Sequence, residues 1–203
     1  MLSPSLRVDV DRGEVEVDGI VSLDAGYLEQ VACRRGTREH ESLFVPDAMP
    51  SAIHAALLLA GFTPGRPGSW RWNERREVEF DAPSGDPVEV LLRIGDEAPR
   101  PVREFIRDAR SGELFPAGPF VFAGSLEREN PPSLGEGTHY LADWSGSVIG
   151  IVTFGDEVVA WREVIPDSAD AAEPVWITRS SELPPPGTRA TLVLRRPASG
   201  RAP

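Results

Sequence analysis

The sequence contains no lysine: all 21 of its basic side chains are arginines, set against 32 acidic side chains. Without lysine the chain has no side-chain amine for Schiff-base chemistry and no lysine general base. Its formal net charge of −11 repels phosphate backbones and anionic lipid headgroups. We therefore expect no nucleic-acid partner.

Cysteine is almost as scarce, since Cys33 is the only one. A single thiol cannot close an internal disulfide, supply a two-cysteine zinc half-site or hold an iron–sulfur cluster. The chain has no window of about 18 apolar residues, so we expect no transmembrane segment. Its N-terminal stretch turns charged too early for a signal peptide. The sequence thus indicates the cytoplasm if the chain is complete as written, and an exported protein if a signal was removed.

Much of the chain shows the two-residue alternation of half-buried β-strands. The alternation runs from Leu6 to Cys33, and residues 87–94 and 189–196 are further predicted strands. Residues 50–61, "PSAIHAALLLAG", differ, because they begin with a proline suited to a first helical turn and end with a glycine stop. This stretch is apolar on nearly every side, which predicts a helix packed inside the protein.

Together these patterns predict an α+β fold with mainly antiparallel β-strands and one buried apolar helix at about 50–61. A chain of 203 residues is long enough to bury one good core. We expect a single domain over residues 1–196, followed by a frayed C-terminal tail over residues 197–203.

The stretch 33–42, "CRRGTREHES", gathers the cysteine and one of the three histidines within ten residues. If Arg35 and Gly36 form a two-residue hairpin turn, strand 27–33 pairs with strand 38–44. Cys33 and His40 are then diagonal neighbours on one face of the hairpin, with backbones about 7–8 Å apart. This geometry permits a site without requiring one.

His54 lies on the predicted helix, where its ring needs a partner such as the Glu41 carboxylate, a backbone carbonyl or a metal. One hypothesis makes Cys33, His40, Glu41 and His54 a cluster of metal ligands, or a Cys–His pair with an acidic residue that orients it. The other makes His54 a hydrogen-bonded core histidine and His40 a partly exposed strand residue. The absence of a known ligand spacing favours the second interpretation.

Two tryptophans, Trp70 and Trp72, lie among arginines in the Pro/Gly-rich segment 63–76, whose pattern predicts a loop. In a basic protein this pattern would suggest base stacking. In this acidic chain we expect the tryptophans to pack or to form cation–π contacts. A binding module would instead expose an apolar or aromatic patch around them.

Residues 32–67 resemble the signature segment of the YdjY-domain family of bacterial proteins, which are abundant in planctomycetes. The matching residues are Cys33, Gly36-Thr37, Glu39-His40-Glu41, Pro50-Ser51 and Ile53-His54-Ala55-Ala56-Leu57. Residues 120–125, 140–143 and 187–194 also look like later segments of the family, so the resemblance covers most of the chain. It implies a location in the periplasm or cell envelope, and it brings no catalytic roles with it.

Two functional readings follow. The first is a non-enzymatic domain that acts as a binding or envelope-associated interaction module, with a protein or a small molecule as its ligand. Its basis is the lack of lysine, of a cofactor motif and of a recognised catalytic constellation. The alternative is a metal- or thiol-dependent enzyme with its site around Cys33, His40, Glu41 and His54. The sequence identifies no cofactor for either reading.

Overall fold

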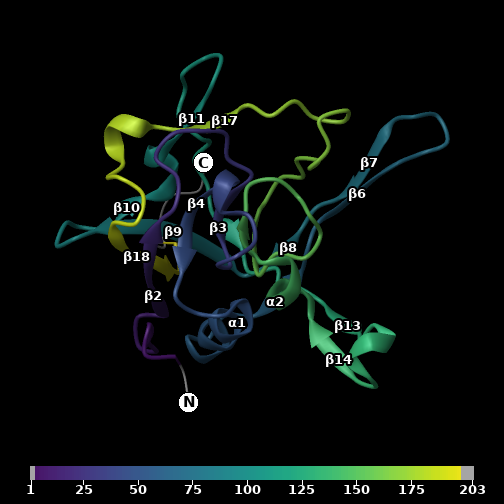
Figure 1. Ribbon diagram of the computed structural model, residues 1–203, viewed down its shortest axis with the longest axis horizontal. Helices are drawn as coiled ribbons and strands as arrows, with labels where there is room; N and C mark the ends of the chain where they lie inside the picture. Colours follow the sequence, from purple (N-terminus) through teal and green to yellow (C-terminus); the bar gives the residue numbers. More distant parts are fainter. Residues whose placement is uncertain (1–2, 198–203) are drawn as a thin grey trace.

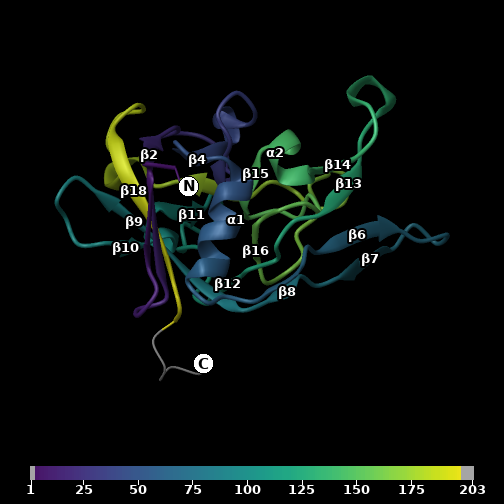
Figure 2. The same cartoon turned by 90° about the horizontal axis from the view of Figure 1, so that it is seen from below.

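The computed structural model describes residues 3–197, and its fold is a closed β-barrel (Figures 1 and 2). The chain is 39% strand and 14% helical, and the described residues include a single helix of seven or more residues. The predicted α+β class is therefore wrong. The strands on both sides of the helix join one sheet that closes on itself, rather than an open sheet covered by a helical layer.

Eight strands form the barrel. Their order around it is β2 (Glu14–Val21), β18 (Arg189–Arg195), β9 (Pro87–Ile94), β12 (Phe120–Val121), β16 (Val159–Trp161), β15 (Ser147–Gly150), β3 (Gln30–Cys33) and β4 (Ser42–Pro46). The barrel closes because β2 pairs with both β18 and β4. Neighbouring strands are antiparallel except for the pairs β15–β16 and β3–β4.

The remaining elements decorate this barrel. β1 (Leu6–Asp9) pairs with β2, and β10 (Arg100–Pro101) pairs with β9. Four small sheets consist of β5 (Pro64–Arg66) with β8 (Ser84–Gly85), β6 (Ser69–Trp72) with β7 (Val78–Asp81), β11 (Ile106–Asp108) with β17 (Trp176–Thr178), and β13 (Glu127–Glu129) with β14 (Thr138–Tyr140). The short helices are η1 (Glu39–Glu41), η2 (Val102–Phe105), η3 (Pro132–Leu134), α2 (Leu141–Ser145) and η4 (Ser180–Glu182).

Apolar side chains that alternate along the strands fill the barrel interior. On β2 the burial alternates residue by residue from Glu14 to Val21, as the sequence predicts. Gly19 takes an inward position at which a Cβ would lie 2.3 Å from the Val45 carbonyl oxygen and 2.4 Å from the Phe44 ring. The large Phe44 ring therefore packs directly against the backbone of the neighbouring strand.

Helix α1 (Pro50–Leu59) lies across one end of the barrel, below β2 and β4 in Figure 1 and in front of the strands in Figure 2. Ile53, Ala56 and Leu57 are buried in the barrel core. Leu58 and Leu59, however, are 46% and 55% exposed, so the predicted burial of the helix on all sides is wrong. A helix that closes one end of a barrel buries only one face. Because the outer face of α1 is also apolar, the sequence does not distinguish the buried face from the exposed one.

The predicted hairpin between residues 27–33 and 38–44 is also wrong. β3 and β4 are neighbours, but they run parallel, with Gln30 beside Ser42. Between them the chain turns and passes through η1, which brings it back to the start of β3 before β4 begins. His40 accordingly lies in a short 3₁₀ helix and not on a strand facing Cys33.

Segment 63–76, predicted as a loop, is part of a two-stranded arm instead. β6 and β7 pair antiparallel, with Trp70 opposite Phe80 and Trp72 opposite Val78. Figures 1 and 2 both show this arm projecting far from the barrel. The prolines and glycines lie at the base of the arm, before β6 begins, so they do not interrupt the strand.

The described residues 3–197 include no helix long and apolar enough to cross a membrane. From position 198 onward the predicted tail 197–203 lies outside the described part of the chain. The domain boundary at residue 196 stays a prediction.

Candidate functional site: an acidic pocket beside an aromatic hairpin

The cysteine of the predicted site is inaccessible. Cys33 ends β3 and is fully buried. Burial raises the pKa of its thiol, although the nearby hydroxyls of Ser42 and Thr37 and the backbone of Arg38 oppose the shift. A buried thiol with a raised pKa is a poor nucleophile and a poor metal ligand, because both roles need the thiolate.

His40 and Glu41 are neighbours on η1, with 3.6 Å between the Nε2 atom of His40 and a carboxylate oxygen of Glu41. The His40 side chain is 78% exposed, so it stands in solvent rather than over a cavity. Glu41 also lies 3.9 Å from the guanidinium of Arg38. This part of the predicted site is therefore a surface cluster of charges.

His54 has a separate environment on α1. Its Nδ1 atom lies 2.8 Å from the hydroxyl of Tyr140, which itself lies 3.0 Å from the Gly124 carbonyl oxygen. The Tyr140 oxygen thus lies within hydrogen-bonding distance of both Nδ1 and the carbonyl oxygen, and the tautomer of His54 decides which group donates to which. The imidazole also packs edge-on against Phe122, and burial lowers its pKa. His54 is thus a neutral, hydrogen-bonded histidine at physiological pH.

Of the four predicted ligands, the structure brings only His40 and Glu41 into direct contact. Within residues 3–197 no group of three or more His, Cys, Asp or Glu side chains could hold a metal ion. Metal binding at these positions stays a prediction, which elemental analysis of the purified protein would test.

A pocket of about 110 Å³ lies on another side of the barrel, beside the start of β3. One water molecule needs only about 10–15 Å³ of such space, so the pocket can hold a small ligand. Most of its wall is apolar, and three carboxyl groups, those of Glu29, Asp167 and Glu173, interrupt it. The lining residues are Leu28, Glu29, Val152, Ile165, Pro166, Asp167, Ala169, Ala172, Glu173, Pro174, Val175 and Trp176.

The carboxyl groups of this acidic pocket outnumber their ion-pair partners. Burial, followed by repulsion from the Glu41 carboxylate, raises the pKa of Glu29 to about 7, while Arg38 pulls it down. Glu173 forms an ion pair with Arg110. Within the described residues Glu29 and Asp167 take part in no ion pair. The pocket therefore combines an apolar wall with two carboxyl groups that form no ion pair among the described residues.

The projecting β6–β7 hairpin is amphipathic. Cross-strand partners share a face, so Trp70, Trp72, Val78 and Phe80 form one side, here called the aromatic face. Phe80 is 64% and Trp72 45% exposed. The opposite side is polar and carries an ion pair between Arg71 and Glu79 at 2.8 Å. An isolated two-stranded hairpin with an exposed apolar side is only marginally stable in water.

One hydrogen bond connects the hairpin to the pocket. The indole Nε1 of Trp70 donates to the Oδ1 atom of Asp167 at 2.8 Å. Trp70 belongs to the aromatic face, and Asp167 lines the acidic pocket. The two features therefore meet at this contact and form a continuous pocket–hairpin surface.

A comparison with protein-family models supports the sequence resemblance. The model of the YdjY domain matches residues 6–195. The chain belongs to the YdjY-domain family. The match begins with the first residue of β1 and ends with the last residue of β18, so the YdjY domain includes the acidic pocket and the hairpin. No curated protein and no solved structure matches the chain. The YdjY family is one of unknown function, so membership alone assigns no activity.

Sequence reasoning named Trp70 and Trp72 as the place of an aromatic patch in a binding module, but it missed the hairpin that carries them and the pocket beside it, for two different reasons. The alternation in "SWRW" and "VEFD" is a strand signal that could have revealed the hairpin and its aromatic face. The pocket has no local signal, because its lining comes from three separate segments, around Leu28, Val152 and residues 165–176. Only the barrel topology brings them together.

Proposed function

We propose that this YdjY domain is a non-enzymatic binding module that holds its ligand on the pocket–hairpin surface. The observation that carries the proposal is the Trp70–Asp167 hydrogen bond, because it joins an exposed aromatic face to a pocket with apolar walls. A concave, mostly apolar pocket with a few converging polar groups is the usual form of a small-molecule site. An adjacent exposed aromatic face adds contact area that a monomeric protein rarely leaves uncovered.

The alternative, a metal- or thiol-dependent enzyme at Cys33, His40, Glu41 and His54, has less support. The Cys33 thiol is buried with a raised pKa, and nothing on the protein surface can reach it. His54 is engaged by Tyr140, while His40 stands in solvent beside Glu41. These positions do not converge on one point where a substrate could react.

Binding can be tested with aromatic fragments and nitrogen-15 NMR. Benzyl alcohol, the benzylammonium ion and benzoate are titrated separately while the indole N–H signals are followed. We expect at least one fragment to shift the signals of Trp70 and Trp176, with a dissociation constant of about millimolar, as suits ligands of about eight or nine non-hydrogen atoms. The signal of Trp144, an exposed tryptophan on α2 outside the pocket, should stay unchanged.

A blocked pocket supplies the control. Ala172→Trp places a large ring in the pocket and should abolish the shifts, because Ala172 lines the wall. Ala171→Trp adds the same ring one residue away, at a position outside the lining, and should preserve them. If no fragment shifts Trp70 or Trp176, or if the Ala172→Trp variant binds as well as the wild type, the proposed function is wrong.

A further inference from the structure

We infer that the ligand of the acidic pocket carries a positive charge, an ammonium or guanidinium group, on an apolar body. This inference rests on the proposed function and adds the chemical class of the ligand. Its basis is a mismatch in the pocket: the apolar wall accepts a hydrocarbon body, while the carboxyl groups of Glu29 and Asp167 take part in no ion pair within the described structure.

The charges around Glu29 come from every element packed against it. η1 supplies Glu41, with His40 beside it, and the segment after β16 supplies Asp167. Among the groups that shift the pKa of Glu29 most, the positive one is Arg38, which lies near Glu41 and stacks on the Phe154 ring at 3.7 Å from its centroid. The other arginine at the pocket, Arg110, is paired with Glu173. Three acidic groups thus share one arginine.

The excess of acidic groups around Glu29 favours a cationic ligand over an anionic or a neutral one. An anion entering the pocket meets the carboxyl groups of Glu29 and Asp167, in a protein whose net charge is −11. A neutral ligand leaves the partly buried carboxyl groups without a counter-charge. A cation pairs with Glu29 and Asp167 in a partly dry site, where charge-assisted hydrogen bonds are strong.

The aromatic surroundings suit such a cation as well. Trp176 lines the pocket, and its ring packs edge-on against Phe115, with the ring centroids 4.8 Å apart, so the ring is held as part of the wall. Trp70 stands at the rim through its bond to Asp167. Indole rings attract ammonium and guanidinium groups through their faces. Both a free amine and an arginine side chain of another polypeptide have this chemistry.

The test compares ligands of one shape and different charge at pH 8. We expect benzylammonium to bind at least tenfold more tightly than benzyl alcohol, and benzoate to bind most weakly. Glu29→Gln should reduce the preference for benzylammonium to below threefold. Glu113→Gln removes the same charge from an exposed position outside the pocket and should leave the preference intact. Asp167→Asn, which keeps the oxygen that accepts from Trp70, gives a second test should the Glu29 variant fail to fold.

The pH dependence is a second readout. The pKa of Glu29 is raised to about 7, so its carboxyl group takes up a proton between pH 8 and 5.5. Benzylammonium affinity should fall severalfold over this range in the wild type and much less in the Glu29→Gln variant. Benzyl alcohol affinity should hardly change.

The outcomes separate the two claims. If benzyl alcohol binds as tightly as benzylammonium, the charge inference is wrong while the binding function stands. If no fragment binds, the proposed function itself fails. When benzylammonium binds, a Gly-Arg-Leu tripeptide with blocked ends distinguishes the two sources of the cation. A polypeptide is indicated if the tripeptide binds more tightly than benzylammonium and if a Trp72→Ser, Phe80→Ser variant loses this binding. A free amine is indicated if the tripeptide binds equally or more weakly.

Discussion

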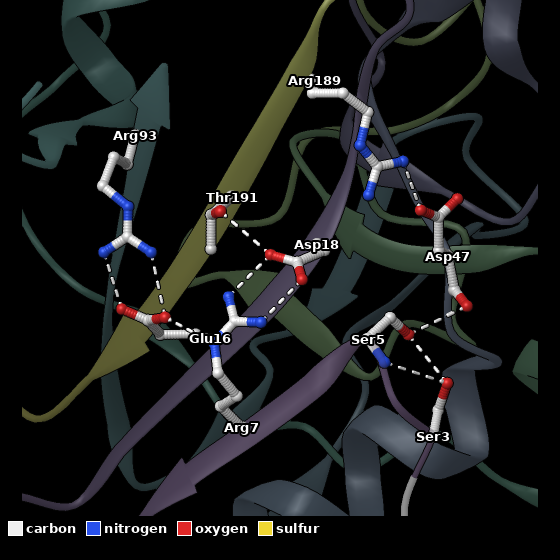
Figure 3. A network of polar contacts seen from close by, with 9 residues as sticks. All are labelled: Ser3, Ser5, Arg7, Glu16, Asp18, Asp47, Arg93, Arg189 and Thr191. Atoms are coloured by element: carbon white, nitrogen blue, oxygen red, sulfur yellow. Dashed lines mark hydrogen bonds and ion pairs between the residues drawn. The ribbon is translucent and has the colours of Figure 1, made fainter. Parts of the chain in front are cut away.

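Two regions of the barrel surface contain acidic side chains, and they differ in whether arginines bind the carboxyl groups. On the outer face of β1, β2, β18 and β9, Arg7 and Arg93 clamp Glu16 and Asp18 (Figure 3). Arg7 binds both oxygens of Asp18 at 2.6 Å, and Arg93 binds both oxygens of Glu16 at 2.7 and 2.9 Å. In the acidic pocket, Glu29 and Asp167 have no such partner among the described residues.

The consequences for protonation are opposite. Hydrogen bonds from Arg93 lower the pKa of Glu16, and those from Arg7 lower the pKa of Asp18. Burial and the nearby Glu41 raise the pKa of Glu29 to about 7. The first region pairs its carboxylates with arginines on neighbouring strands, whereas the two carboxyl groups of the second form no ion pair among the described residues.

The largest difference should be visible in direct titration. Carbon-13 NMR of the side-chain carboxyl groups should show Glu29 changing protonation near pH 7, because it is partly buried beside Glu41. Glu16 and Asp18 should titrate below their ordinary values, since their arginine partners favour the charged forms. A Glu29 transition at or below its ordinary value of 4.5 would remove the contrast.

Reversing the charge of Arg7 should destabilise the region in which Arg7 and Arg93 pair with Glu16 and Asp18. Arg7→Glu sets a third carboxylate beside Glu16 and Asp18, and should lower the free energy of unfolding at pH 7 by about 2 kcal/mol. Arg7→Gln, which only removes the pairs, should cost about 1 kcal/mol because the site is partly exposed. Urea unfolding measures both, and equal stability of all three proteins would show that the clamp contributes nothing.

Removing a charge should have the opposite effect in the pocket. The folded state holds the Glu29 proton more tightly than the unfolded chain does, so the wild type loses stability as the pH rises from about 4.5 through about 7. Glu29→Gln avoids this loss. The free energy of unfolding of the variant, measured against the wild type, should therefore be higher at pH 8 than at pH 4 by roughly 1 kcal/mol, after allowance for the partial exposure of Glu29. Thermal or urea unfolding at both pH values checks the sign.

Added salt should reduce the stability changes caused by Arg7→Glu and by Glu29→Gln by a few tenths of a kcal/mol. Raising sodium chloride from 0.05 to 0.5 M shortens the screening length below about 10 Å, which weakens attraction and repulsion alike. The loss caused by Arg7→Glu and the pH 8 gain caused by Glu29→Gln should therefore both shrink. If salt changes neither, the stability differences arise from packing and not from charge.

Local patterns were sufficient for many of the elements. The alternation of β2 and the apolar run of β9 predicted those strands, and Pro50 predicted the first residue of α1. The family resemblance around residues 32–67 was confirmed by the match over residues 6–195. These features depend on neighbouring residues, whose spacing and propensities are present in the chain itself.

Long-range features could not be obtained in the same way. A turn at Gly36 is compatible with a hairpin or with a crossover, and only the return through η1 makes β3 and β4 parallel. The exposure of Leu58 and Leu59 depends on where the barrel ends, which the composition of the helix does not encode. The four predicted ligands were grouped by proximity along the chain, yet folding placed Cys33 and His54 in separate buried environments.

The sequence by itself determined the acidic balance, the absence of lysine, the strand-rich character and the family of this protein. The tertiary structure alone decided that the sheet closes between β2 and β4, that the tryptophan hairpin projects from it, and that Glu29 and Asp167 meet in one pocket. The physical reason is that alternation fixes which way a side chain points along its own strand. Which distant segment lies opposite depends on closure of the whole barrel.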